Sequence, residues 1–306
     1  MISGMTKTAK TKFIQKYDWT QDILPYLDNM EAVAGGYTSV RRGVVMLADG
    51  VRVFIKIASA QKTIKWLKKE VKAYQILNQA GYPYIPQLLS FDQENTSMAI
   101  EYMDGASFES TWDGDKLQAM LVIQEELKKY KRYFINDPDF TLESVVNRTV
   151  KWPIILAPGN LEVVNVKLTK LGINLVLTKE QISGLQSMHR GWSMHEDTLV
   201  HQDLRADNFG YYNKTKSGKL IDWNWLCIGD ESLDRTPLFV NMYISGFDPY
   251  KLDPEAYDAK MLAYLVSFWL DQILMGDEDS NSLEFSRRKA QAKSVKACIE
   301  LLNRGH

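Results

Sequence analysis

The stretch LVHQDLRADNFGYYN, residues 199–213, constrains the fold of this chain most strongly. Its residues 201–208 include a histidine, two aspartates, an arginine and an asparagine, with Leu199 and Val200 leading in and aromatic residues leading out. A solvated surface loop can carry such charges, but it has no need of apolar flanks. The pattern therefore predicts polar chemistry on a loop held between two strands, or between a helix and a strand.

The N-terminal third of the chain reads as strands, one helix and strands again. Glycines and β-branched runs in residues 31–57 predict two strands joined by a turn at residues 48–50. Residues 61–81 carry apolar residues at helical spacing and end at a glycine. Residues 86–103 return to strand character. The order favours a small β-rich unit with one helix.

The rest of the chain reads as mainly helical. Residues 117–134 predict an amphipathic helix, and residues 177–191 predict a helix that begins with a capping box at Thr178. Residues 151–164 are broken by proline and glycine, and we expect them to be irregular. The apolar run at residues 261–275 is shorter than a membrane span and contains an aspartate, so it predicts a buried helix.

Length and composition fit a two-lobed α+β protein. The 306 residues allow a smaller N-terminal lobe at 1–103 and a larger, mostly helical lobe at 104–306. The net charge of −1 gives no reason to expect nucleic acid or a membrane surface. Cys227 and Cys298 lack metal-ligand spacing, and the polar N-terminus lacks a secretory signal. We expect a cytoplasmic protein with reduced thiols, and no motif indicates an obligatory protein partner.

Three oxygen-bearing side chains are spaced so that two neighbouring loops can bring them together. Asp203 and Asn208 lie five residues apart, and Asp222 follows the short apolar segment 219–221. The oxygens of Asn208 and Asp222 suit Mg²⁺, which prefers hard oxygen ligands. Asp203 would then be left to face a substrate hydroxyl. Phosphoryl transfer needs this combination of a metal clamp and a carboxylate, together with a cation on the phosphates.

Lys56 supplies a candidate for that cation. It lies within the predicted strand VRVFIKI, where apolar neighbours make an anionic partner necessary. Glu70, on the helix that follows, is the candidate partner because the rest of that helix surface is rich in lysine. The alternatives are an ordinary edge-strand lysine at 56 and a solvated glutamate at 70.

The motif HQDLRADN followed by LIDWNW resembles the aminoglycoside phosphotransferase family, within the protein-kinase-like fold. In that family the loop pattern is His-x-Asp-x-x-x-x-Asn, and an aspartate opening the next motif binds metal. These positions, with the family's strand lysine and helix glutamate, fall here on His201, Asp203, Asn208, Asp222, Lys56 and Glu70. The resemblance implies a kinase that uses ATP and Mg²⁺ to phosphorylate a small hydroxylated molecule.

The resemblance also implies further roles. Asp203 would orient the acceptor hydroxyl and accept its proton late in the reaction. The backbone of Glu101 and Met103, in the linker between the lobes, would meet the edge of the adenine. We expect His201 to brace the loop, and Arg205 to pair locally with other charges. Trp223 and its neighbour Trp225 are expected to pack in the core.

The phosphate loop departs from the protein-kinase pattern Gly-x-Gly-x-x-Gly. The segment AVAGGYTSVRRG has a glycine pair, Gly35 and Gly36, which still frees the backbone to approach phosphate. Tyr37, Thr38 and Ser39 could add N–H or hydroxyl donors.

The metal motif Asp-Trp-Asn-Trp replaces the Asp-Phe-Gly of protein kinases, and no Ala-Pro-Glu segment follows it. Both differences indicate a small acceptor rather than a protein. A kinase-like protein that holds nucleotide without turnover is the alternative. Acidic loops at 247–258 and 276–284 would suit a cationic acceptor such as an aminoglycoside or a choline-like amine. Acidic loops are often only solvated, so a neutral sugar, a macrolide or another natural product stays open.

Overall fold

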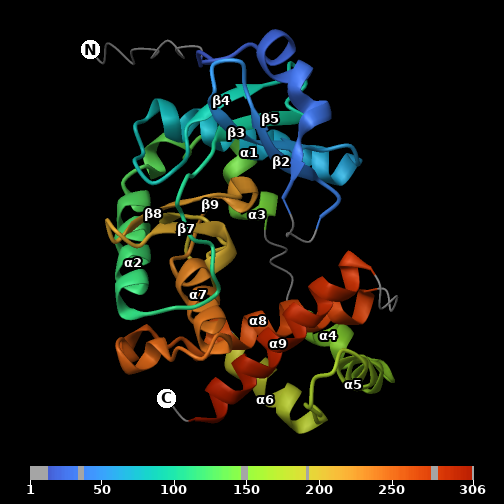
Figure 1. The fold of residues 1–306 in the computed structure, drawn as a ribbon. Coiled ribbons are helices and arrows are strands. Elements are labelled where there is room, and N and C mark those ends of the chain that lie inside the picture. Colours follow the sequence, from blue (N-terminus) through green and yellow to red (C-terminus); the bar gives the residue numbers. More distant parts are fainter. Residues whose placement is uncertain (1–12, 34–37, 146–150, 191–192, 277–281, 305–306) are drawn as a thin grey trace, which may run out of the picture.

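A computed structural model describes residues 13–33, 38–145, 151–190, 193–276 and 282–304. The N-terminal strands lie together at one end of the molecule, and the C-terminal helices lie at the other (Figure 1). This order of strands, one helix, strands and then mainly helices agrees with the α+β class predicted from the sequence.

The N-terminal part forms a five-stranded antiparallel sheet with the order β1-β2-β3-β5-β4. Its strands are β1 (Glu31–Ala32), β2 (Arg41–Met46), β3 (Arg52–Ile57), β4 (Leu88–Phe91) and β5 (Ser97–Glu101). The predicted turn between β2 and β3 is present, and Gly50 there has a φ of +79°, which glycine adopts without a steric penalty. Helix α1 (Gln61–Gln79) connects β3 to β4.

The two faces of the sheet have different environments because side chains alternate along each strand. One face, with Val45, Val53 and Ile55, packs against the short helical segments η1 (Trp19–Ile23) and η2 (Leu24–Asn29). The other face, with Met98 and Ile100, joins the main core, which also contains the buried side of α1. Lys56 lies on this second face, directly opposite Met98 of β5.

Helix α1 buries the residues that the helical spacing predicts, including Leu67, Val71 and Tyr74. Glu70 lies on the same buried side, because positions three and four residues apart share a face of a helix. The chain leaves the helix at Gly81, whose φ of +77° is typical of a residue that ends a helix.

Two short two-stranded sheets carry the loop that the sequence singles out. Strand β6 (Thr198–Val200) pairs with β9 (Cys227–Gly229), and β7 (Phe209–Tyr212) pairs with β8 (Ser217–Leu220). The loop at 201–208 therefore runs from one small sheet to the other. It is held between two strands, as predicted.

The remaining helices form most of the second half of the described chain. The longer ones are α2 (Gly114–Lys128), α5 (Asn160–Lys170), α6 (Lys179–His189), α7 (Ser232–Ile244), α8 (Ala259–Met275) and α9 (Leu283–Asn303). The short ones are α3 (Leu142–Val145), α4 (Trp152–Ile155), η3 (Lys131–Tyr133), η4 (Pro138–Phe140), η5 (Ala206–Asn208), η6 (Trp223–Trp225), η7 (Pro249–Lys251) and η8 (Pro254–Ala256).

The capping box predicted at Thr178 and the buried helix predicted at 261–275 are both present. Thr178 and Gln181 form the reciprocal capping box at the start of α6. Helix α8 covers the apolar run at 261–275 and packs against α9, α6 and α5. None of the helices in the described part of the chain combines the length and the apolar character that a membrane crossing needs.

The prediction of irregular structure at residues 151–164 is wrong. Helix α4 begins there with a proline in its first turn, where the missing N–H costs no hydrogen bond. Gly159, with a φ of +81°, then reverses the chain and precedes α5. The proline and glycine that break the pattern mark helix starts rather than the absence of helices.

Candidate active site

His201 fixes the start of the loop that links β6 to β7. Its buried ring donates from Nε2 to the carbonyl of Ile221 at 3.0 Å and accepts the backbone N–H of Asp203 at Nδ1, at 3.3 Å. The edge of the Trp223 ring packs against it, with ring centroids 4.6 Å apart. Burial lowers the pKa of His201 to about 4, so the ring is neutral at pH 7. The geometry is that of a brace, as the sequence predicts.

Asp234, in the first turn of α7, holds the same loop by its backbone. Its carboxylate accepts the N–H groups of His201 at 3.0 Å and Gln202 at 2.5 Å. Burial raises the pKa of Asp234 to about 7, although the two backbone hydrogen bonds act in the opposite direction. Gln202 has a φ of +66°, and its side-chain amide donates to the carbonyl of Trp225 at 3.1 Å. Asp234 thus anchors the loop to the helical part of the chain.

Asp203 lies at the centre of the loop and is bound from two sides. Arg205 contacts it through Nε at 2.9 Å and through a terminal nitrogen at 3.2 Å. The amide nitrogen of Asn208 donates both to the carbonyl and to the carboxylate of Asp203, each at 2.9 Å. Burial raises the pKa of Asp203, and the charge of Arg205 opposes that shift. Arg205 also pairs with Asp207 at 3.5 Å, so its local pairing is confirmed.

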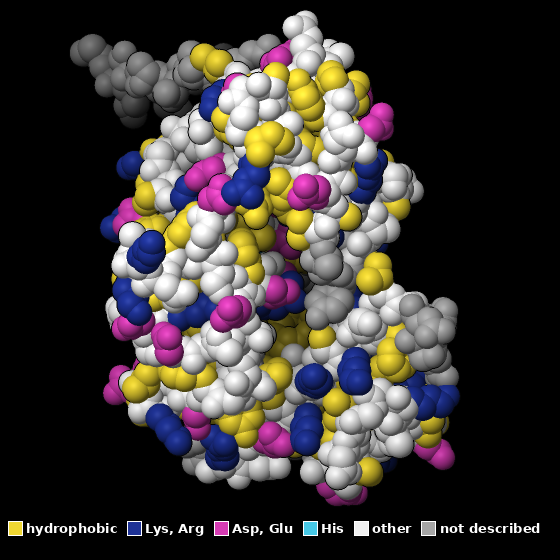
Figure 2. Space-filling model, viewed as in Figure 1, with side chains coloured by type: hydrophobic (Ala, Val, Ile, Leu, Met, Phe, Trp, Pro, Cys, Tyr) yellow, Lys and Arg dark blue, Asp and Glu magenta, His cyan; other side chains and the backbone are white. Residues whose placement is uncertain are grey.

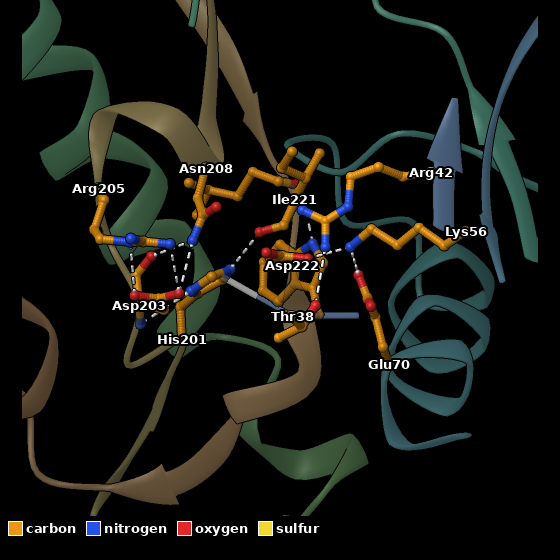
Figure 3. Close-up of polar contacts among 12 residues, drawn as sticks. Thr38, Arg42, Lys56, Glu70, His201, Asp203, Arg205, Asn208, Ile221 and Asp222 are labelled. Atoms are coloured by element: carbon orange, nitrogen blue, oxygen red, sulfur yellow. Dashed lines mark hydrogen bonds and ion pairs between the residues drawn. The ribbon is translucent and has the colours of Figure 1, made fainter. Parts of the chain in front are cut away.

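Lys56 lies between two carboxylates, one from each part of the chain (Figure 3). Its Nζ donates to Oε1 of Glu70 at 2.7 Å and also forms an ion pair with Asp222. The Lys56 and Glu70 side chains are 6% and 4% exposed, whereas that of Asp222 is 33% exposed. Asp222 is therefore the member of the trio that a ligand can reach.

The three charges depend on one another. Burial disfavours the ammonium of Lys56, but Asp222 and Glu70 raise its pKa above the ordinary value. Burial also raises the pKa of Glu70 in spite of Lys56. Burial also acts to raise the pKa of Asp222, but there the charge and hydrogen bond of Lys56 outweigh it and keep the pKa below the ordinary value. Lys56 and Asp222 are thus charged at neutral pH, as a phosphate and metal site requires.

The part of the predicted phosphate loop that the structure describes lies beside this trio. Arg42 of β2 donates to the hydroxyl of Thr38 at 2.9 Å, and Figure 3 shows its guanidinium beside Asp222. Ser39 is exposed. The predicted phosphate contacts at residues 35–37 lie outside the described residues. Arg42 is a site residue that our sequence analysis missed, although strand alternation places it on the same face as Lys56.

The predicted adenine-binding linker begins where β5 ends. The backbone N–H of Glu101 donates to Gln87 at 2.9 Å, so this N–H is engaged within the protein. The carboxylate of Glu101 binds Lys219 of β8 at 2.7 and 2.9 Å. Met103 is buried and packs where a Cβ of Gly210 would stand. These contacts fasten the linker to the β7–β8 hairpin next to Asn208.

The acidic loop at 247–258 is largely engaged with the protein itself. Asp248 pairs with Arg304 at 2.7 Å, and Asp253 pairs with Arg235 at 2.9 Å. Asp258 caps the start of α8. Most of the second acidic segment, at 277–281, lies outside the described residues. The structure therefore gives the loop at 247–258 a stabilising role in addition to any role toward a cation.

The surface of the described part of the chain has hollows that polar side chains line. A cavity of about 670 Å³ lies between the first turns of α7 and α8, and its lining includes Glu231, Arg235, Glu255 and Lys260. The face drawn in Figure 2 is also hollowed at its centre, and side chains of both charges line that depression. Both are polar enough for a hydroxylated ligand.

The donor set around Asp222 fits Mg²⁺ in its usual protein setting. Mg²⁺ is commonly held by one or two protein oxygens together with substrate phosphates. The carboxylate of Asp222 and the amide oxygen of Asn208, which lies opposite the nitrogen bound to Asp203, are such oxygens. Within the described ranges no group of three or more His, Cys, Asp or Glu side chains forms a closed metal cage. An open site completed by phosphates is consistent with both observations.

Comparison with known proteins identifies the fold. No family model and no curated protein matches the chain in sequence. Among solved structures, an aminoglycoside 2′-phosphotransferase mutant in complex with GDP is similar at 17% identity, with a TM-score of 0.55 and 94% of each chain covered.

Two small-molecule kinases are also similar. The choline kinase LicA from Streptococcus pneumoniae matches at 16% identity with a TM-score of 0.50, over 88% of this chain and 95% of that one. The ethanolamine kinase of Plasmodium vivax matches at 14% identity with a TM-score of 0.50, over 89% of this chain and 82% of that one. The chain therefore has the kinase-like fold of the aminoglycoside phosphotransferases and the choline and ethanolamine kinases.

Proposed function

We infer that this protein transfers the γ-phosphate of Mg·ATP to a hydroxyl group of a small molecule. The observation that carries the proposal is the contact of Lys56 with both Glu70 and Asp222. It joins a strand lysine to a helix glutamate and to the loop that follows β8, next to Asp203 and Asn208. A cation, a metal-binding oxygen and a carboxylate for the acceptor are thus supplied at one place, as phosphoryl transfer requires.

Each side chain has a distinct part in this proposal. Lys56 binds the phosphates, and Glu70 keeps its amine in position. Asn208 and Asp222 hold Mg²⁺, which when bound neutralises charge on the phosphates. Asp203 orients the acceptor hydroxyl and takes its proton late in the transfer. Arg205 and the amide of Asn208 fix the carboxylate of Asp203 by hydrogen bonds from two sides.

The nucleotide is proposed to lie between the N-terminal lobe, residues 1–103, and the helical lobe, residues 104–306. The backbone of Glu101 and Met103 would contact the adenine edge, through the groups that Gln87 does not already engage. Thr38 and Ser39, with the glycine pair before them, would contact the phosphates. Both lobes contribute to the Lys56 trio, which supports a site between them.

The acceptor is proposed to be a small hydroxylated molecule. The similar solved structures are named for aminoglycosides, choline and ethanolamine, which supports an acceptor of that size. Asp248 and Asp253 each have a cationic partner within the protein, so an amine-bearing acceptor would have to compete with Arg304 or Arg235 for them. Neutral sugars and macrolides therefore belong in the same substrate panel as aminoglycosides and choline.

The test is nucleotide-dependent phosphorylation of that panel, with ATP or GTP and Mg²⁺, by wild type, Asp203→Asn and Asp222→Ala. We expect Asp203→Asn to lose transfer by at least about a hundredfold while it keeps thermal stabilisation by nucleotide. We expect Asp222→Ala to lose Mg²⁺-dependent nucleotide affinity. Asp207→Asn, an exposed aspartate on the same loop, is the matched control and should keep most of its activity.

Two results would contradict the proposal. Equal turnover by wild type and Asp203→Asn would show that Asp203 is not the carboxylate that accepts the proton of the acceptor hydroxyl. Binding of Mg·ATP by wild type, with no transfer to any member of a broad hydroxylated panel, would favour a protein that holds nucleotide without turnover.

A further inference from the structure

Strand β2 presents two adjacent arginines to opposite faces of the sheet. Arg41 is exposed, and its guanidinium donates to the carbonyl of Leu27 at 3.1 Å. Arg42 is half-buried and lies directly opposite Lys56 of β3 in the antiparallel register. Because neighbours on opposite strands of an antiparallel pair point to the same face, Arg42 and Lys56 both face α1 and the candidate active site. Figure 3 shows the two side chains extending toward Asp222.

Arg42 contacts the segment predicted to cover the phosphates. Its terminal nitrogen donates to the hydroxyl of Thr38 at 2.9 Å, just after the described chain resumes. Its positive charge also acts on the carboxylates of the trio, where it contributes to lowering the pKa of Asp222 and opposes the rise in the pKa of Glu70. Arg42 is therefore part of the same charge cluster as Lys56.

The charge balance of this cluster explains why a second cation is useful. Lys56 has a single ammonium group, and it already faces Glu70 and Asp222. Before Mg²⁺ is bound, one cation and two carboxylates without Arg42 would leave a net negative site, which repels an anionic phosphate chain. With Arg42, the four charges sum to zero, and phosphate can approach without that repulsion. A guanidinium also offers a planar set of N–H donors that matches phosphate oxygens.

We propose that Arg42 is a second phosphate-binding cation, which donates to oxygens of the phosphate chain of a nucleoside di- or triphosphate beside Lys56. The inference rests on the proposed function, because it assigns a further residue to that nucleotide site. The guanidinium of Arg42 has further N–H groups besides the one bound to Thr38, and these would bind phosphate oxygens. Selectivity for di- and triphosphates over the nucleoside follows from this contact.

The test compares the affinities of Mg·ATP, Mg·ADP, AMP and adenosine by calorimetry for wild type, Arg42→Gln and Arg42→Lys. We expect Arg42→Gln to lower the affinity for ATP and ADP by about tenfold to a hundredfold, because it loses a charge-assisted hydrogen bond. The affinity for adenosine should not change. Arg42→Lys should lie between, because it keeps the charge without the planar fork. Arg41→Gln, the neighbour on the opposite face, is the matched control and should bind all four ligands as wild type does.

The outcomes separate this inference from the proposed function. ATP binding by Arg42→Gln equal to that of wild type would overturn the inference and leave the proposed function intact. Equal weakening of ATP and adenosine would also overturn it, in favour of a role for Arg42 in holding Thr38 and the fold. Wild-type protein that binds none of the four ligands would overturn the proposed function itself. A melting temperature for Arg42→Gln close to that of wild type shows that the affinities refer to folded protein.

Discussion

The buried ion pair of Lys56 and Glu70 gives a quantitative test of the site. Replacing Lys56 by methionine keeps the length of the side chain and removes its charge. Glu70 would then lie 4% exposed without its cation, while Asp222 stays 33% exposed and keeps part of its solvation. An isolated carboxylate in such surroundings takes up a proton rather than stay charged. The expected cost of Lys56→Met is therefore the cost of protonating Glu70.

The free energy of unfolding that Lys56→Met loses depends on the pH. A glutamate ionises in the unfolded chain with a pKa of about 4.3, and each pH unit above it costs about 1.36 kcal/mol when the folded state must hold the proton. At pH 7 the loss of stability is thus up to about 3.7 kcal/mol, within the range of about 3–5 kcal/mol known for broken buried pairs. At pH 5 it falls to about 1 kcal/mol. The sign is that of a raised folded-state pKa, so the destabilisation grows as the pH rises above 4.3.

The assay is urea denaturation of wild type, Lys56→Met, Glu70→Gln and the double variant at pH 5 and pH 7. The double variant has no buried carboxylate to protonate, so we expect it to recover most of the stability that Lys56→Met loses at pH 7. Lys72→Met is the matched control on α1, the helix that carries Glu70, because Lys72 is 36% exposed and its pairs with Asp137 and Asp139 lie nearer the surface. It should cost less than about 1 kcal/mol at either pH.

A loss in Lys56→Met that is equal at pH 5 and pH 7 would refute this reasoning, because protonation of Glu70 would then play no part. Additive losses in the double variant would refute it as well, since they would mean that Lys56 and Glu70 do not interact.

Three further variants test other parts of the structure. Arg205→Gln removes the cation that opposes the raised pKa of Asp203, so the acidic limb of the pH profile of kcat/KM should move to higher pH. Trp223→Ala empties a fully buried site and should cost about 3–5 kcal/mol in urea denaturation. Thr178→Ala removes the capping hydrogen bond to Gln181 and should cost about 1 kcal/mol, with no change in the KM for ATP.

Each of these variants has a result that would count against its explanation. An acidic limb that stays in place or moves to lower pH in Arg205→Gln would mean that Arg205 does not stabilise the charged form of Asp203. A loss below about 1 kcal/mol in Trp223→Ala would contradict its burial in a close-packed core. Thr178→Ser keeps the capping hydroxyl and should retain wild-type stability; a loss equal to that of Thr178→Ala would exclude the cap as the cause.

Sequence patterns predict much of the fold where the apolar residues follow a single helical or strand period. The helical spacing of Leu67, Val71 and Tyr74 predicts α1 and its buried side, and alternation predicts β3. Helix α5 was missed because Pro158 and Gly159 are read as breakers, although both lie before its first residue, Asn160, and leave the helix itself uninterrupted. A proline or glycine can mark either irregular structure or the start of a new helix. Here the packing of α5 against α8 favours the helix.

For the candidate site, the sequence predicts several of the residues but not all of their contacts. Spacing and the resemblance lead to Lys56, Glu70 and Asp222, but the contact of Lys56 with Asp222 joins residues 166 positions apart, for which no local pattern exists. The anchoring of the loop amides by Asp234 is likewise a product of the tertiary fold. Arg42 was within reach of sequence reasoning, since the alternation that places Lys56 also places its cross-strand neighbour.

Backbone strain is concentrated where the proposed chemistry needs it. Four non-glycine residues in the described chain have positive φ, and two of them, Asn95 and Lys216, lie in turns between adjacent strands, where such angles are common. The other two both have a φ of +66°: Gln202 lies in the loop after β6, and Asp222, a member of the trio, lies just after β8. Glycine would adopt these angles without the cost of about 1–2 kcal/mol that a side chain brings. The chain bears that cost at Asp222, which pairs with Lys56, so the strain coincides with the residue to which the proposed function assigns Mg²⁺.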